Sequence, residues 1–348
     1  MNKKSARRPQ VRPLTPLSGS LSDLRAAKEE WSGRLLKRKS LQGVRAFTVA
    51  VTPDLDWNLM GVGIGEKIVG MQRTGLMCVK FLVRAKYHDK HIDKKHRLPK
   101  SIAGLPVDVD EVGLLRRFAT APALNTPNPR TRIRPAQPGC SIGFLNPAGQ
   151  YNAGTFAALV KDSEGLYILS NNHVLADEGQ LNPGVPVSQP GSLDDGSPAT
   201  DEIAQLTRFI KLQPGAPNKV DCALAAVDRS TDVSNSILQI GPPQGAREAQ
   251  VDMTVHKFGR TTGYTVGHVT SIDTDVSLQY ETGIFTFAGQ ITIVGSQGQP
   301  FADAGDSGAL ILERGSNEAV GLLIGGSSSH GTASHLSDVL SALKVTLA

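Results

Sequence analysis

The chain has 348 residues, 39% of them apolar, so it can bury a sizeable core and is longer than one compact domain usually needs. No run approaches the roughly 20 apolar residues of a membrane helix. The three cysteines lack metal-ligand spacing, which argues against a zinc site. So few cysteines also argue against a disulfide framework and favour a reducing, cytoplasmic compartment. The net charge of +5 is uneven, because residues 1–125 carry 24 lysines and arginines against 11 acidic residues and residues 126–348 carry 13 against 21, which predicts two physically different units.

The N-terminal third is predicted to hold a basic segment and a small accessory domain. Residues 1–41 are basic and in part disordered, show no secretory signal, and contain one expected helix from Asp23 to about Lys39. Residues 42–118 are the predicted α+β domain. There, MGVGIG and LMCVKFLVRA indicate two strands joined by a loop containing Gly75, and LPVDVDEVG alternates apolar and polar residues as a half-buried strand does.

The rest of the chain is predicted to be mainly β. Residues 119–138 contain five prolines and indicate a linker. Over residues 139–348, short apolar runs are separated by Gly, Asn, Asp and Pro, which is typical of an all-β sandwich or barrel. The last segment, LSDVLSALKVTL, has apolar residues at helical spacing and predicts a C-terminal helix.

The stretch ADAGDSGAL places Ser307 between an acid and a glycine, just before an apolar run. Gly305 and Gly308 permit a sharp turn whose N–H groups stay unblocked, so the hydroxyl could meet a substrate while neighbouring amides face an oxyanion. A polar turn before a strand is the other interpretation, since a short motif is only a hypothesis. A nucleophilic serine needs a histidine base and an orienting acid elsewhere in the chain.

Two further positions fit these roles. His173 follows the apolar run in LYILSNNHVLA, so a predicted strand would deliver it rigidly to a rim. Asp221 directly precedes the apolar run in VDCALAAV, where a buried carboxylate needs a donor such as a histidine N–H. A satisfied core histidine and a surface aspartate at a strand start are the alternatives.

These segments, in the order His173, Asp221, Ser307, resemble the His, Asp and Ser boxes of chymotrypsin/trypsin-like serine peptidases, and KFGRTTGYTVGHV resembles the segment before the Ser box in bacterial members. The resemblance covers about residues 139–345. GVGIGEK and LPVDVDEVG ahead of it are similar to an intracellular bacterial and plant subset that includes the Narrow leaf 1 type. The resemblance to these peptidases implies a chymotrypsin-like double β-barrel over residues 139–348 with a C-terminal helix, preceded by the small α+β domain. It also implies that His173, Asp221 and Ser307 lie at the seam between the two barrels.

By this resemblance Ser307 would be the nucleophile, His173 the base and Asp221 the acid that orients the imidazole. The amides of Gly305 and Ser307 would form the oxyanion hole. Asp306 would pair with a buried cation that orders the oxyanion loop, which in secreted members is a new N-terminus made by cleavage. No such N-terminus is evident here, so Asp306 needs another partner, or a regulatory partner or assembly must order the loop.

The resemblance also predicts the substrate-binding residues, with the base of the specificity pocket near Phe301. Without an aspartate at that base, a small or medium apolar side chain is expected before the scissile bond, although Asp303 could reach the pocket. Departures from the family pattern are Ala309 after the Ser box, Asn171 and Asn172 before the histidine, and the absence of its disulfides; none removes a catalytic atom. The expected substrate contacts are Phe301, Ala302, Asp303, Ile324, Gly325 and Gly326.

The predicted function is therefore a cytoplasmic serine endopeptidase that acts on protein substrates through an acyl-enzyme intermediate, without cofactor, metal or membrane. The alternative is a catalytically idle trypsin-like scaffold that binds protein or nucleic acid. The basic N-terminal half supports nucleic-acid binding only generically and carries no recognised nucleic-acid-binding motif. The basic N-terminal half could equally dock on the acidic half of the chain, bind a regulatory protein, or form the contact between copies in a homo-oligomer.

Overall fold

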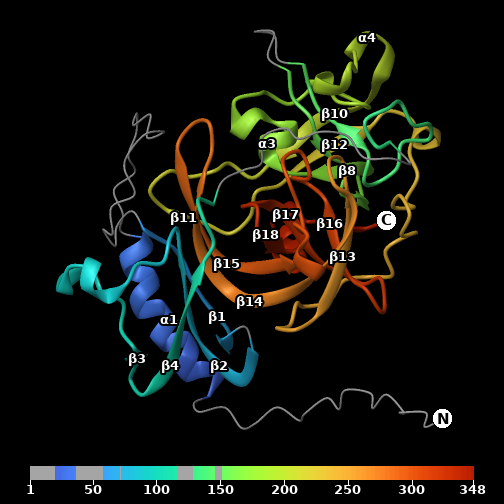
Figure 1. Ribbon diagram of the computed structural model, residues 1–348. Helices are drawn as coiled ribbons and strands as arrows, with labels where there is room; N and C mark the ends of the chain where they lie inside the picture. Colours follow the sequence, from blue (N-terminus) through green and yellow to red (C-terminus); the bar gives the residue numbers. More distant parts are fainter. Residues whose placement is uncertain (1–19, 37–57, 71, 116–127, 146–150) are drawn as a thin grey trace, which may run out of the picture.

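The computed structural model describes residues 20–36, 58–70, 72–115, 128–145 and 151–348 (Figure 1). The fold is mainly β, as predicted. Figure 1 shows a blue and cyan N-terminal unit, a green first barrel and an orange to red second barrel. None of the helices in these described ranges is long and apolar enough to cross a membrane.

Six strands form the second barrel. β14 pairs with β13 on one side and with β15 on the other, and the ring continues through β18, β17 and β16 back to β13. Inward-facing Val, Ile, Leu, Phe and Ala side chains fill its core. The strands are β13 (Thr254–Gly259), β14 (Gly263–Gln279), β15 (Ile284–Gly295), β16 (Leu310–Glu313), β17 (Ala319–Gly326) and β18 (His330–His335), with β11 (Pro217–Asn218) added beside β15.

The first barrel is built on a six-stranded sheet in the order β19-β7-β8-β12-β10-β9. The short strands β5 and β6 close it, because Ile142 pairs with Gly154 ahead of β7 while Gly143 pairs with Ser188 of β9. The strands are β5 (Ser141–Ile142), β6 (Gly154–Thr155), β7 (Ala158–Lys161), β8 (Leu166–Ser170), β9 (Pro186–Ser188), β10 (Glu202–Phe209), β12 (Ala223–Val227) and β19 (Thr346–Leu347).

The N-terminal unit continues the sheet of the second barrel, because β1 pairs with β14. Its strands are β1 (Leu59–Val69), β2 (Gln72–Val83), β3 (Ser101–Ile102) and β4 (Leu105–Glu111), so the three strand-like segments were predicted correctly. The hairpin turns at Gly70, however, and Gly75 lies inside β2. The basic stretch between β2 and β3 forms two short 3₁₀ turns, Asp89–His91 and Lys94–His96.

The predicted N-terminal helix is present as α1 (Leu21–Leu36), and residues 37–39 lie outside the described ranges. Its buried face, which includes Leu24 and Trp31, packs on the β1–β2 hairpin. The helix therefore belongs to the accessory unit rather than to a separate N-terminal segment. On the same face, Lys28 Nζ lies 3.0 Å from Asp275 Oδ1 of β14, so a basic residue of this unit pairs with an acidic residue of the second barrel, which is one of the roles expected for the basic half.

Two predictions concern the limits of the barrel unit. Residues 119–127 of the expected linker fall outside the described residues, but residues 128–138 pack against the first barrel, where Ala136 is fully buried and pairs with Val233. This part of the predicted linker therefore belongs to the barrel. The C-terminal helix is confirmed as α5 (Leu336–Leu343), whose apolar face enters the first-barrel core. The other short helices are α3 (Asn172–Leu175) and α4 (Pro198–Asp201).

Candidate active site

Two neighbouring strands of the first barrel bring the histidine and the aspartate together. His173 lies in α3, directly after β8, and Asp221 lies just before β12. The two strands are antiparallel partners, with Ser170 at the end of β8 opposite Ala223 at the start of β12. The end of one strand thus lies beside the start of the other, and residues 48 positions apart in the chain become neighbours.

Asp221 is fully buried and accepts four hydrogen bonds. Its Oδ2 lies 2.5 Å from His173 Nδ1 and accepts the Tyr280 hydroxyl at 2.7 Å; its Oδ1 accepts the N–H groups of Asn172 at 2.7 Å and His173 at 3.3 Å. Burial alone would raise the pKa of Asp221, but the His173 ring and these hydrogen bonds hold that pKa below its usual value. An ionised carboxylate only accepts, so a neutral His173 carries its proton on Nδ1 and its lone pair on Nε2.

Ser307 lies on the loop between β15 and β16 of the second barrel, against the first barrel. The N–H of Thr155 in β6 donates to Ser307 O at 2.8 Å. A Cβ on Gly154 would lie 3.1 Å from Ser307 O and 2.5 Å from Val174 Cγ2, so β6 touches both the serine loop and the helix of His173. Among the described residues, neither Ser307 Oγ nor His173 Nε2 has a hydrogen-bond partner, and both atoms are buried.

The serine loop presents two amides on one turn. Gly305 and Gly308 adopt φ values of +91° and +90°, which favour glycine. The N–H of Asp306 donates to Asp303 O at 3.0 Å, whereas the N–H groups of Gly305 and Ser307 bond to none of the residues that the structure describes. Two unengaged amides on one turn, one of them belonging to the serine itself, can both donate to an oxyanion.

Lys257 on β13 is the buried cation beside Asp306. Its Nζ lies 3.1 Å from Asp306 Oδ2, and neither side chain is exposed. The same carboxylate accepts the N–H groups of Thr261 at 2.8 Å and Thr262 at 3.1 Å, and the hydroxyl of Thr262 at 2.6 Å. Burial lowers the pKa of Lys257, and the charge of Asp306 opposes that shift. The sequence did not identify Lys257 as this partner, although Lys257 opens the segment KFGRTTGYTVGHV.

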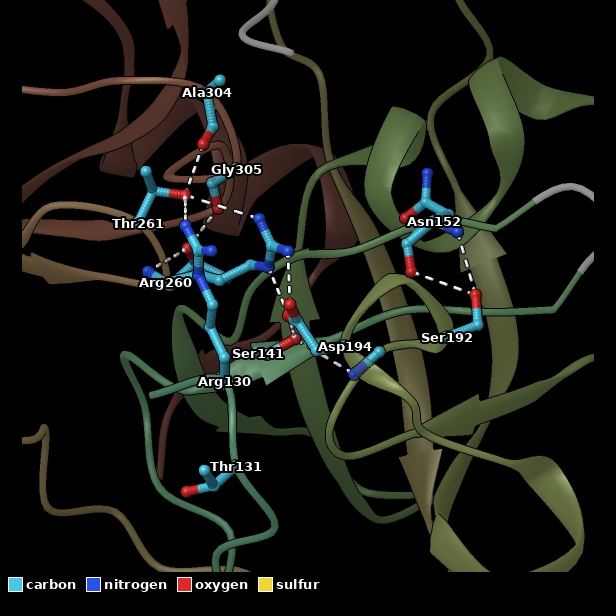
Figure 2. A network of polar contacts seen from close by, with 12 residues as sticks. Arg130, Thr131, Ser141, Asn152, Ser192, Asp194, Arg260, Thr261, Ala304 and Gly305 are labelled. Carbon is cyan, nitrogen blue, oxygen red and sulfur yellow. Dashed lines mark hydrogen bonds and ion pairs between the residues drawn. The ribbon is translucent and has the colours of Figure 1, made fainter. Parts of the chain in front are cut away.

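A second buried cation, Arg260, ties the serine loop to the first barrel (Figure 2). Its guanidinium donates to Asp194 through Nε at 2.5 Å and through Nη2 at 2.6 Å, and Ser141 donates to the same carboxylate at 2.6 Å. Its backbone N–H donates to Thr155 Oγ1 at 3.1 Å, which in turn donates to Gly305 O at 2.9 Å. One arginine therefore fixes both barrels around the loop that carries the unengaged amides.

The two asparagines that depart from the family pattern act on the same strand ends. Asn171 Nδ2 donates to Asp221 O at 2.7 Å, and Asn172 Nδ2 donates to Ile210 O at 2.7 Å. Asn171 therefore holds the backbone of the aspartate, and Asn172 holds the backbone of the segment that follows β10. Tyr280 was also missed, and no sequence signal marks it, because it lies 59 residues after Asp221 and outside every recognised segment.

The six residues expected to contact substrate lie in different environments. Phe301 and Ala302 lie in the core of the second barrel, and Ile324 lies in an apolar cluster with Tyr280. Asp303 is exposed, and its carboxylate accepts the N–H of Ala304 at 2.7 Å. Gly325 and Gly326, at the end of β17, are buried. Substrate contact by these six residues stays a prediction.

The structure places the predicted histidine and aspartate on the first barrel and the predicted serine on the second. Residues 219–340 match the family model of the Nal1 C-terminal domain, which agrees with the resemblance to the Narrow leaf 1 type. The comparison with curated proteins gave no match.

Among solved structures, the chain is similar to three proteases at low sequence identity. Protease A of Thermobifida fusca is 18% identical, with 60% of this chain and 96% of that chain covered and a TM-score of 0.43. A glutamic acid-specific serine protease is 18% identical, with 61% and 100% covered and a TM-score of 0.42. A chymotrypsin of Cellulomonas bogoriensis is 19% identical, with 61% and 97% covered and a TM-score of 0.42.

Proposed function

We propose that this protein is a serine endopeptidase in which Ser307 is the nucleophile, His173 the general base and Asp221 the residue that orients and stabilises the imidazole. The observation that carries the proposal is the buried Asp221–His173 hydrogen bond at 2.5 Å, combined with a His173 Nε2 and a Ser307 Oγ that have no hydrogen-bond partner among the described residues. Catalytic hydrogen bonds are often long before substrate binds, so the unmade Oγ–Nε2 bond is compatible with this role.

The chemistry follows from these positions. Ser307 Oγ attacks the scissile carbonyl while His173 Nε2 takes its proton, and Asp221 stabilises the imidazolium that results. The amides of Gly305 and Ser307 donate to the oxyanion of the tetrahedral intermediate. The intermediate collapses when His173 returns the proton to the leaving amine, and a water molecule then hydrolyses the acyl-enzyme by the same steps.

The proposal includes a serine loop that needs no freed N-terminus. Lys257 occupies the place beside Asp306 that a new N-terminus fills in secreted members, and Arg260, directly after β13, connects the same loop to Asp194 and Thr155 of the first barrel. Regulation by a protein partner or by assembly, which the sequence predicted, would then act on substrate access or on the N-terminal unit rather than through a cleaved N-terminus.

The test is covalent labelling of the purified full chain with a fluorophosphonate probe, read by intact mass. The wild type is expected to gain one adduct and Ser307→Ala none. Ser296→Ala is the matched control, because Ser296 Oγ lies 3.2 Å from His268 Nε2 and thus forms a serine–histidine pair without an aspartate. Labelling that survives in Ser307→Ala, or a wild type that is not labelled, would overturn the proposal and leave the idle scaffold.

A further inference from the structure

Tyr280 touches both members of the histidine–aspartate pair. It directly follows β14, at the tip of the long β14–β15 hairpin that extends past the second barrel toward α3 (Figure 1). Its hydroxyl donates to Asp221 Oδ2 at 2.7 Å, and its ring meets the His173 ring edge-on, with the centroids 5.5 Å apart. A single buried side chain of the second barrel therefore contacts the two catalytic groups of the first.

The hairpin tip that carries Tyr280 is anchored to the first barrel. The carboxylate of Glu178, just beyond α3, accepts the N–H groups of Glu281 and Thr282, each at 2.9 Å, and the hydroxyl of Thr282 at 2.5 Å. The Tyr280 ring also stacks on Phe287, with the centroids 5.8 Å apart. These contacts hold the hairpin tip and the ring while the hydroxyl bonds Asp221.

The N-terminal unit supplies part of the packing around Tyr280. β1 pairs with β14 from Gly61 opposite Val276 onward, and the N–H of Gln279 donates to Leu115 O at 3.4 Å. Tyr280 belongs to a buried apolar cluster, the Tyr280 cluster, whose members include residues of β1, β2 and the segment after β4. The members from the N-terminal unit are Met60, Leu82, Val112 and Leu115.

We propose that Tyr280 is a positioning residue for the Asp221–His173 pair and that the N-terminal unit acts on the catalytic site through it. The inference rests on the proposed function. A hydroxyl that donates to Asp221 takes up part of its negative charge and restricts its rotation, so it sets both the orientation of His173 and the strength with which Asp221 holds the imidazolium. Without that donor, the full charge of Asp221 acts on the imidazolium of His173.

The first experiment compares Tyr280→Phe with Tyr264→Phe in the full chain. Tyr264 is a matched control because its ring also meets a histidine ring edge-on, with the centroids 5.7 Å apart, while its hydroxyl bonds His256 Nδ1 at 3.2 Å rather than a carboxylate. Tyr280→Phe is expected to slow fluorophosphonate labelling about tenfold near neutral pH and to move the acidic limb of its pH profile up by roughly half a unit to one unit, whereas Tyr264→Phe leaves both unchanged.

A second readout does not depend on activity. The protonation midpoint of His173, followed by NMR of histidine-labelled protein, is expected to rise in Tyr280→Phe and to stay in place in Tyr264→Phe. An unchanged midpoint in Tyr280→Phe overturns the inference whether or not the wild type is labelled. An unlabelled wild type whose His173 midpoint nevertheless responds to Tyr280→Phe overturns the proposed function and supports the positioning role.

The contribution of the N-terminal unit is tested with two leucines on opposite faces of one hairpin. Leu82 lies in the Tyr280 cluster, whereas Leu59 lies in the cluster beneath α1, and both are almost fully buried. Leu82→Ala is expected to shift the His173 midpoint in the same direction as Tyr280→Phe, and Leu59→Ala is expected to leave it in place. Equal shifts in the two variants, or none in either, would overturn the coupling.

Discussion

Lys257 Nζ lies 3.1 Å from Asp306 Oδ2, and both side chains are completely buried. Each of these charges is stable in the interior only because the other is present, and the backbone amides of Thr261 and Thr262 satisfy the rest of the carboxylate. Since Asp306 directly precedes Ser307, this ion pair links the core of the second barrel to the position of the proposed nucleophile.

Removing the charge of Lys257 alone is expected to destabilise the protein more than removing the charges of both Lys257 and Asp306. Lys257→Met leaves Asp306 buried and uncompensated, which costs about 3–5 kcal/mol in the free energy of unfolding. The double variant Lys257→Met, Asp306→Asn is expected to regain part of that loss. Urea denaturation measures both. Fluorophosphonate labelling is expected to fall in both variants, and a Lys257→Met protein with wild-type stability would contradict the argument.

The turn at Gly305 is expected to tolerate no side chain. A Cβ there would lie 2.4 Å from Arg260 Nη1 and 2.6 Å from Thr261 Oγ1, at a φ of +91°. Gly298 has a φ of +72° with no atom within 4 Å, so Gly298→Ala isolates the backbone cost of about 1–2 kcal/mol. Gly305→Ala is expected to lose about 1–3 kcal/mol more and to abolish labelling. Equal losses of stability in the two variants would show that Arg260 does not confine the loop.

His330 is expected to make stability depend on pH in the mildly acidic range. Burial lowers the pKa of His330 from 6.5 to about 4; Asp110 opposes the shift and Lys80 adds to it. Between these two values the unfolded chain binds a proton at His330 and the folded protein does not. The contribution of His330 to the free energy of unfolding is therefore complete above pH 6.5 and is lost as the pH falls toward about 4.

The measurement is the urea midpoint of the wild type and of His330→Gln from about pH 7 to about pH 4. The two curves are expected to converge as the pH falls, because the variant lacks the titrating group. Parallel curves over this interval would show that His330 is not held neutral in the folded protein.

The three cysteines are expected to be unreactive in the folded protein. All are buried, and burial raises the pKa of Cys78 and of Cys140 to about 12 and that of Cys222 well above its usual value. Ellman's reagent is expected to find no fast-reacting thiol in the native protein near pH 8 and all three after denaturation. One stoichiometric fast thiol in the native sample would contradict this burial.

Local patterns were sufficient for the elements that bury one face. The alternation in LPVDVDEVG predicted β4, and the helical spacing of LSDVLSALKVTL predicted α5, because each pattern reflects burial within a few residues. Local patterns did not predict where strands end or where the barrel unit begins. The expected loop at Gly75 became part of β2, since cross-strand pairing extends the hairpin to Gly70, and residues 128–138 pack on the barrel despite their prolines.

The sequence by itself was enough to propose the residues of the site: His173 and Asp221 each adjoin an apolar strand and Ser307 lies in a glycine turn, so short segments point to them. Only the tertiary structure decided what surrounds them. Tyr280 reaches Asp221 because the β14–β15 hairpin crosses to the first barrel, and the N-terminal unit reaches Tyr280 because β1 pairs with β14. Strand order and register join residues far apart in the chain, and no local periodicity encodes such pairings.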